Sequence, residues 1–305
     1  MESNFKHNPP KLEGDRMIEP PMMDVEHIKR KWLDIPYAAQ SPAQKMDIYL
    51  PPEGNGPFPV ICEFHGGAWL FGDKRDTQQI PMLRGLEKGY AVVCVNYRLS
   101  GEAIFPCQIF DAKAAIRYIR ANASTYLLDG SRIGAWGPSA GGHLVSLLGT
   151  TAGVKELEDL SMGNAGFSSA VQAVVDWCGP SEDFIQMDEE FKKSCMGLAD
   201  HSSPGSPESL LLGQHILIAS ELVRFASPMT YANKDIPPFF IQHGSLDQVV
   251  PVEQSIHFAA ALEKAAGKEK VTLDVVPGLT HHGDPAWDTE EMSDKVFGFL
   301  DRHLK

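Results

Sequence analysis

Apolar residues in this chain follow two alternating patterns: short unbroken runs and longer segments with helical spacing. Unbroken runs are typical of strands buried on both faces of a sheet. Such runs, the first two of them short, lie at 33–38, 45–51, the first part of 59–69, 90–99, 132–136, 170–179, 237–244 and 271–278. Segments with helical spacing lie at 78–89, 107–123, 140–150, 252–267 and 291–304. Strands that alternate with helices predict an α/β domain, in which a mostly parallel sheet is covered by helices on both faces.

Two segments depart from this alternation. The chain begins with many prolines and charges, so residues 1–30 are predicted to be a loosely held N-terminal arm, and residues 31–305 the α/β domain. Between about 180 and 235 the sequence has short helical pieces and no clean strand, which indicates a cap-like insertion over one end of the sheet. The insertion either packs on the sheet edge or shapes a substrate pocket, since ligands in such folds bind beyond the carboxyl ends of the strands. Both interpretations stay open.

Composition and charge narrow the class of protein. The 305 residues are 43% hydrophobic and 22% charged, as in ordinary globular proteins, and the net charge of -13 argues against nucleic acid or an anionic membrane as a partner. The chain shows neither the apolar core of a secretory signal nor a run of about 18 apolar residues, so we expect a cytoplasmic protein. Its five scattered cysteines, Cys62 and Cys94 among them within strand-like runs, favour buried free thiols over disulfides.

A serine stands at the junction of a predicted strand and a predicted helix. Ser139 lies in a Gly-x-Ser-x-Gly frame, Gly137 to Gly141, and this strand–turn–helix context is the one in which the frame indicates a nucleophile elbow. Glycines suit the frame because a Cβ there would collide with the neighbouring strand and helix, and Pro138 favours an extended Gly137. The alternative is a plain glycine turn. A serine nucleophile needs a base, an acid that orients the base, and donors for the developing oxyanion.

The predicted acid follows a strand late in the chain. Asp247 lies in the compact turn HGSLDQVVP, directly after a strongly apolar strand, where backbone donors can hold a carboxylate rigidly. Asp183, shortly after the preceding strand, is the rival if the insertion folds inward. Asp247 is preferred because its turn leads straight into a predicted helix.

The predicted base comes last in the chain. His281 and His282 lie side by side after the final strand, which completes the order Ser, Asp, His. We favour His282 over His281 because Gly283 follows it. A histidine pair also suggests a metal site, but neighbours in an extended loop point apart and no third ligand has suitable spacing, so neither a metal nor another cofactor is expected.

The oxyanion donors are predicted from a glycine loop. His65, Gly66 and Gly67 directly follow a buried strand, and bare backbone N–H groups there can approach a substrate oxygen. Ala140, at the start of the helix after the serine, would supply the second half of the oxyanion hole. His65 is expected to brace the loop by hydrogen bonding, and Trp69 to lie in the core or in the wall of the substrate pocket.

Four motifs together, HGGAW, GPSAGGHL, HGSLDQVVP and GLTHHGD, resemble the α/β-hydrolase carboxylesterases near the hormone-sensitive-lipase group, closest to the branch with bacterial feruloyl- and acetyl-esterase-like enzymes. The resemblance extends over 33–304. It implies a nucleophile, an acid, a base and three oxyanion donors, which are respectively Ser139, Asp247, His282, and Gly66, Gly67 and Ala140. The sequence departs from the family at Pro138, where such enzymes often carry a polar residue, and at Ala68, where the loop lacks a third glycine.

The expected activity is hydrolysis of carboxylic esters through an acyl-enzyme intermediate, without a cofactor. The substrates would be small molecules, short acyl or aryl esters that include feruloyl or acetyl esters of plant polysaccharide. An arylformamidase of the kynurenine formamidase type is an alternative, because those enzymes share a His-Gly-Gly-x-Trp loop. A non-catalytic small-molecule-binding module on the same fold is the alternative from another class, and the presence of all three triad residue types argues against it.

Overall fold

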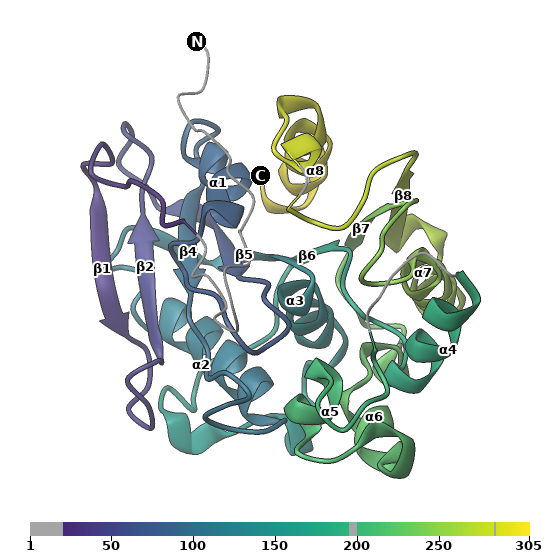
Figure 1. Cartoon of the computed structure of the whole chain (residues 1–305). Coiled ribbons are helices and arrows are strands. Elements are labelled where there is room, and N and C mark those ends of the chain that lie inside the picture. Colours follow the sequence, from purple (N-terminus) through teal and green to yellow (C-terminus); the bar gives the residue numbers. More distant parts are fainter. Residues whose placement is uncertain (1–20, 195–199, 284) are drawn as a thin grey trace.

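An eight-stranded sheet forms the centre of the protein (Figure 1). The computed structural model describes residues 21–194, 200–283 and 285–305. The strands are β1 Lys31–Pro36, β2 Lys45–Tyr49, β3 Phe58–Phe64, β4 Ala91–Val95, β5 Leu128–Pro138, β6 Ala173–Trp177, β7 Phe239–Gly244 and β8 Val271–Val276. Their order is β1-β2-β4-β3-β5-β6-β7-β8, in which β2 is antiparallel to both neighbours and the pairs from β4 to β8 are parallel. Each strand lies within or overlaps a predicted apolar run.

The burial of the strands explains their apolar runs. Every residue of β3, β4, β6 and β7 is buried, because these strands have a neighbour on each side and helices above and below. β1, at the antiparallel edge, has no buried residue. The central strands are therefore fully packed, and they form a rigid support for the loops at their carboxyl ends.

Helices cover both faces of the sheet (Figure 1). α1 Ile80–Leu83 and α8 Glu290–Leu304 lie on one face, and α2 Cys107–Ala121, α3 Ala140–Thr150 and α7 Val252–Ala266 lie on the other. Each set of helices packs its own apolar cluster against the sheet. The predicted mostly parallel sheet with helices on both faces is confirmed.

The helix predicted at 78–89 is much shorter than its apolar spacing suggested. Only α1 is α-helical, and the 3-10 turns Thr77–Gln79 and Arg84–Leu86 flank it. Pro81 sits at its start, and Gly85 follows, where a Cβ would lie only 3.0 Å from the Cδ1 atom of Ile61 in β3. Proline and glycine both weaken a helix, and a larger residue at the glycine would crowd the Ile61 side chain of the sheet.

The predicted N-terminal arm falls partly outside the described residues, which begin at 21. The described end of the arm is packed and not loose. Met23, Val25 and Ile28 are buried in the same apolar cluster as α8, and the Met23 N–H donates a hydrogen bond to the Arg75 carbonyl at 2.7 Å. The sequence did not predict that these three residues are buried, because they are single apolar positions among charged ones.

The predicted insertion lies between β6 and β7, and its described residues form three short α-helices, α4 Phe184–Ser194, α5 Pro207–Leu212 and α6 Ser220–Ala226. It contacts the two segments that follow β3 and β5. The ring of Phe184 packs against the Trp69 ring at 5.5 Å, and His143 Nε2 donates to the Ala226 carbonyl at 2.8 Å. The insertion therefore lies against the glycine loop and the helix that follows Ser139.

Cysteines and helix lengths complete the description. Cys62, Cys94, Cys107 and Cys178 are free thiols, and Cys195 lies outside the described residues. Within 21–194, 200–283 and 285–305, none of the helices has the length and apolar character that crossing a membrane requires.

Candidate active site

Ser139 lies on a sharp turn between β5 and α3. Its backbone angles, φ 54° and ψ -121°, are unusual for a residue with a side chain and strain the turn. The glycines around it permit this turn. A Cβ on Gly141 would lie 1.9 Å from the Phe64 carbonyl oxygen, and one on Gly137 would lie 2.5 Å from the Gly141 backbone. The geometry is that of the predicted elbow, with the hydroxyl presented at the carboxyl end of the sheet.

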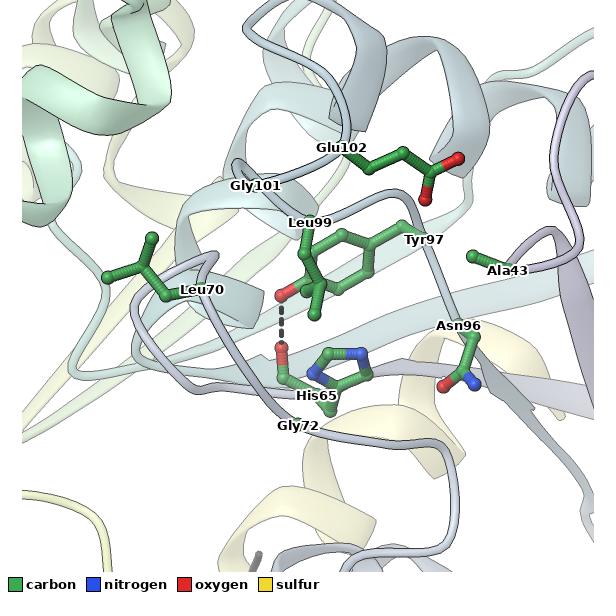
Figure 2. A pocket seen from close by; sticks show the side chains of 9 residues that line it. All are labelled: Ala43, His65, Leu70, Gly72, Asn96, Tyr97, Leu99, Gly101 and Glu102. Carbon is green, nitrogen blue, oxygen red and sulfur yellow. Dashed lines mark hydrogen bonds between the residues drawn. The ribbon is translucent and has the colours of Figure 1, made fainter. Parts of the chain in front are cut away.

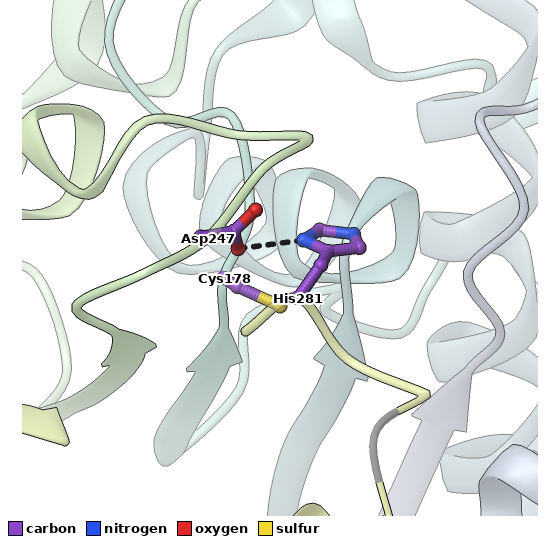
Figure 3. Close-up of side chains that lie close together, drawn as sticks. All are labelled: Cys178, Asp247 and His281. Atoms are coloured by element: carbon purple, nitrogen blue, oxygen red, sulfur yellow. Dashed lines mark hydrogen bonds and ion pairs between the residues drawn. The ribbon is translucent and has the colours of Figure 1, made fainter. Parts of the chain in front are cut away.

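His281 connects Ser139 to Asp247. His281 Nε2 lies 3.0 Å from the Ser139 Oγ atom, and His281 Nδ1 lies 2.6 Å from the Asp247 Oδ2 atom (Figure 3 shows the second contact). Because the carboxylate only accepts, Nδ1 carries a proton and Nε2 is left to accept the serine hydroxyl proton. The structure thus corrects the sequence prediction, which favoured His282.

The correction has a simple physical reason. The backbone bends at His281 and neighbouring side chains leave it in different directions, and it is the His281 ring that lies beside the serine. Gly283, the residue that favoured His282, has φ 110° and accounts for the turn after the pair rather than for the direction of either ring.

Asp247 is held by backbone and side-chain donors. The N–H groups of Val249 and Val250 donate to its Oδ1 atom at 2.8 and 2.9 Å, and His243 Nε2 lies 3.1 Å from its Oδ2 atom. These contacts are the rigid support that the compact turn predicted. The rival Asp183 has a structural task instead, because its Oδ1 atom accepts the N–H groups of Ile185 and Gln186 at the start of α4.

The electrostatics of the pair suit a general base. Burial alone would favour a neutral Asp247, but the positive imidazole of His281 and the hydrogen bonds from His243 and His281 outweigh it and hold the pKa of Asp247 well below its usual value. Burial also opposes a charged His281, but the Asp247 carboxylate, which also accepts its hydrogen bond, outweighs burial and holds the pKa of His281 well above its ordinary value of 6.5. Asp247 therefore stays ionised while His281 titrates.

We expect a pH profile that follows from this shift. The imidazolium form of His281 cannot accept a proton, so kcat/KM should fall as the pH drops through the raised pKa. A plot of log kcat/KM for p-nitrophenyl acetate against pH should rise along a single acidic limb with a midpoint above about 6.5. In Asp247→Asn the midpoint of the residual activity should move down, since the attractive charge is lost. A parent midpoint at or below 6.5 would contradict the assignment.

The glycine loop lies against Ser139, but one predicted donor is already engaged. The Gly66 N–H donates to the Gln78 Oε1 atom at 3.0 Å, although a Cβ on Gly66 would lie only 3.4 Å from the Ser139 Cβ atom. Gly67 has φ 108° and Ala68 has φ 52°, so the chain turns sharply there beside the serine. Gly66 thus ties the loop to Gln78, a contact that the sequence did not indicate.

His65 stabilises this loop through its own contacts. Its Nδ1 atom lies 2.7 Å from the Gly66 carbonyl oxygen. Its ring stacks on Tyr97 at 4.4 Å, and the Tyr97 hydroxyl donates to the His65 carbonyl at 2.9 Å (Figure 2). Burial lowers the pKa of His65 to about 4, although its bond to the Gly66 carbonyl opposes the shift, so the ring is neutral near pH 7.

A cavity of about 300 Å³ lies beside His65 and Tyr97, and Figure 2 shows the residues that line it. None of Ser139, Asp247 and His281 is among them. The cavity lies beside the His65 ring that supports the loop, and its lining does not include the serine hydroxyl.

Among the residues that the structure describes, two groups have enough ligand atoms close together to hold a metal. Cys178, Asp247 and His281 form the first, and Glu182, Glu190 and His257 form the second. The sequence showed no third metal ligand near the histidine pair. In the structure Cys178, which is about 100 residues away along the chain, lies close to His281 and Asp247. In the second group His257 Nδ1 lies 2.8 and 3.2 Å from the two carboxylates, which joins α4 to α7.

The chain is similar to known esterases in sequence and in structure. The BD-FAE family matches residues 46–262. The chain is 31% identical over 256 residues to the probable carboxylic ester hydrolase LipM of Mycobacterium tuberculosis, a match that covers 82% of this chain and 56% of LipM. The chain thus spans little more than half the length of this relative.

Two solved structures are also similar to the chain. A truncated form of a carbohydrate esterase from gut microbiota is 32% identical, has a TM-score of 0.82, and is matched over 93% of this chain and 99% of its own. A bifunctional GH43-CE protein of Bacteroides eggerthii is 37% identical, with a TM-score of 0.80 over 90% of this chain and 35% of that one. Both matches extend over nine-tenths or more of this chain.

Proposed function

We propose that this chain, which belongs to the BD-FAE family, is a serine carboxylesterase that cleaves small carboxylic esters through an acyl-enzyme intermediate. The α/β-hydrolase fold implied by the sequence resemblance is confirmed by the sheet and by the solved esterase that matches it over its whole length. The observation that carries the proposed mechanism is the continuous chain from the Ser139 hydroxyl through both nitrogens of His281 to the Asp247 carboxylate.

In the proposed acylation each residue has one role. His281 takes the proton of Ser139 as the Oγ atom attacks the ester carbonyl, and the ionised Asp247 stabilises the imidazolium that forms. Backbone N–H groups would hold the oxyanion, each worth about 10²–10³ in rate. Gly67 and Ala140 are the proposed donors, whereas Gly66 would first have to release Gln78. His281 then returns the proton to the leaving alcohol.

Deacylation repeats the same steps with water. His281 accepts a proton from a water molecule, the resulting hydroxide attacks the acyl-Ser139 carbonyl, and the oxyanion donors act a second time. The proton then passes from His281 back to the serine Oγ atom, which frees the acid product. Every proton in the cycle is held at His281 Nε2, so no further group has to titrate.

For the substrate we propose short acyl or aryl esters, with acetyl or feruloyl esters of plant polysaccharide as the leading class. The similar solved structure is named a carbohydrate esterase, which supports a carbohydrate ester. The pocket wall would be built by Trp69, which directly follows the glycine loop, and by the insertion, since the ring of Trp69 packs on Phe184. The Trp69 side chain is only 2% exposed, so it would limit the depth of the pocket and not its rim.

A substrate panel tests this proposal. p-Nitrophenyl esters of increasing acyl length, methyl ferulate and acetylated xylan should be hydrolysed, with kcat/KM highest for the shortest acyl groups or for the aryl ester. N-formylkynurenine serves as the comparison substrate and should be turned over much more slowly. Faster cleavage of N-formylkynurenine than of every ester would establish a formamidase instead. Tight binding of small esters without turnover would establish the non-catalytic module.

A further inference from the structure

A thiol that the proposed mechanism does not use lies against the catalytic pair. Figure 3 shows Cys178, Asp247 and His281 converging from three segments, which follow β6, β7 and β8. The Cys178 Sγ atom, one nitrogen of His281 and one carboxylate oxygen of Asp247 all lie within 4.8 Å of one another. Cysteine, histidine and aspartate are together a ligand set that Zn²⁺ accepts.

The backbone fixes this thiol in place. Cys178 is fully buried and has φ 45°, a conformation that residues with a side chain rarely adopt. Its N–H donates to the Gln242 carbonyl of β7 at 2.9 Å, which ties it to the strand that leads to Asp247. The backbone that carries the sulfur is thus held by the sheet.

We propose that Cys178, Asp247 and His281 form an inhibitory site for Zn²⁺, in which the metal replaces the proton between Asp247 and His281. The proposal rests on the proposed serine esterase function, because the metal acts by disabling the base. It commits to a thiophilic divalent cation, since the hard ions Mg²⁺ and Ca²⁺ require oxygen ligands.

The distances allow such a site after side-chain shifts of up to about 1.5 Å, because the sulfur atom lies within 4.8 Å of the other two ligand atoms. Zn²⁺ binds nitrogen and oxygen at about 2.0–2.2 Å and sulfur at about 2.3 Å, so the edges of a tetrahedral site measure roughly 3.3–3.6 Å. The Asp247 Oδ2 and His281 Nδ1 atoms, now 2.6 Å apart, would have to separate by less than about 1 Å. A thiolate and a carboxylate would also neutralise the two charges of the metal, which matters at a buried position.

Metal binding here would change the tautomer of His281. Zn²⁺ displaces the thiol proton of Cys178 to water and takes the Nδ1 lone pair of His281. The single ring proton of the neutral imidazole then resides on Nε2. An Nε2–H facing the Ser139 Oγ atom can no longer accept the serine proton. The triad would keep its arrangement in space and lose its base.

A Zn²⁺ titration of ester hydrolysis tests the proposal. Each variant is normalised to its own metal-free activity on p-nitrophenyl acetate. Cys178→Ala and Cys178→Ser should raise the Zn²⁺ concentration for half-inhibition at least about tenfold. Removing a residue that only supports a metal ligand already lowers metal affinity by about 10–100-fold, and removing the ligand itself should lower it at least as much. Cys107→Ser and His257→Ala are matched controls, in a different thiol and in the other metal-capable group, and should leave the half-inhibition concentration unchanged.

A direct binding measurement separates this proposal from the proposed function. Cd²⁺ or Co²⁺ added to Ser139→Ala should give the absorption of a metal–thiolate bond at about one equivalent, and the double variant Ser139→Ala/Cys178→Ala should lack it. This readout needs no esterase activity. Retained absorption in the double variant, or an unchanged half-inhibition concentration in Cys178→Ser, would overturn the site. Far-ultraviolet circular dichroism would show whether each variant is folded, and Cys178→Ser keeps the size of the side chain for that reason.

Discussion

Replacing His281 by alanine is expected to lower kcat for p-nitrophenyl acetate by about 10⁴–10⁶-fold, because the serine loses its only proton acceptor in the chain to Asp247. Replacing the adjacent His282 by alanine should cost less than about 10²-fold, the size of an indirect misplacement. Steady-state kinetics on both purified variants would measure this contrast. The two substitutions remove the same side chain from neighbouring positions, so each serves as the control for the other.

The opposite outcome would restore the sequence prediction. If His282→Ala lost activity by several orders of magnitude and His281→Ala did not, the loop after β8 would have to shift in the active enzyme so that His282 replaced His281 beside Ser139. Equal, modest losses in both variants would show that neither histidine acts as the base. Thermal unfolding of both variants would exclude loss of the fold as the cause.

The alternation of apolar runs and helical segments was enough to predict the sheet. Strands buried on both faces need apolar residues at every position, and that requirement leaves a direct trace in sequences such as 237–244. The elbow was equally readable, since Gly137 and Gly141 meet backbone atoms at distances that no Cβ tolerates. Local requirements of this kind are set by a few adjacent residues, so one sequence suffices to recognise them.

Contacts between distant segments could not be predicted in the same way. The direction of His281 depends on how the loop leaves β8, and the single N–H of Gly66 is taken by Gln78, which lies twelve residues along the chain. Cys178 looked like another buried thiol at the end of a strand. Only the parallel order of β6, β7 and β8 brings it beside Asp247 and His281. Such pairings depend on the register of the whole sheet.

Replacing Ser139 by alanine is the second substitution for which we expect a large loss of activity. Without the hydroxyl there is no acyl-enzyme, so kcat should fall by about 10⁴–10⁶-fold, and the remaining rate would come from the oxyanion donors and substrate binding alone. A fluorescent organophosphonate should label the parent at Ser139 and should not label Ser139→Ala, as judged by intact-protein mass spectrometry. Labelling of the variant, or turnover near the parent rate, would refute the serine as nucleophile.

Ser139→Gly separates the chemistry of this residue from its backbone strain. Both variants lack the hydroxyl and should be equally inactive, but only glycine adopts φ 54° and ψ -121° without cost. We therefore expect Ser139→Gly to raise the free energy of unfolding by about 1 kcal/mol over Ser139→Ala, measured by urea denaturation. A gain in stability at the cost of all activity would show that the fold tolerates a strained residue here because the reaction requires its hydroxyl.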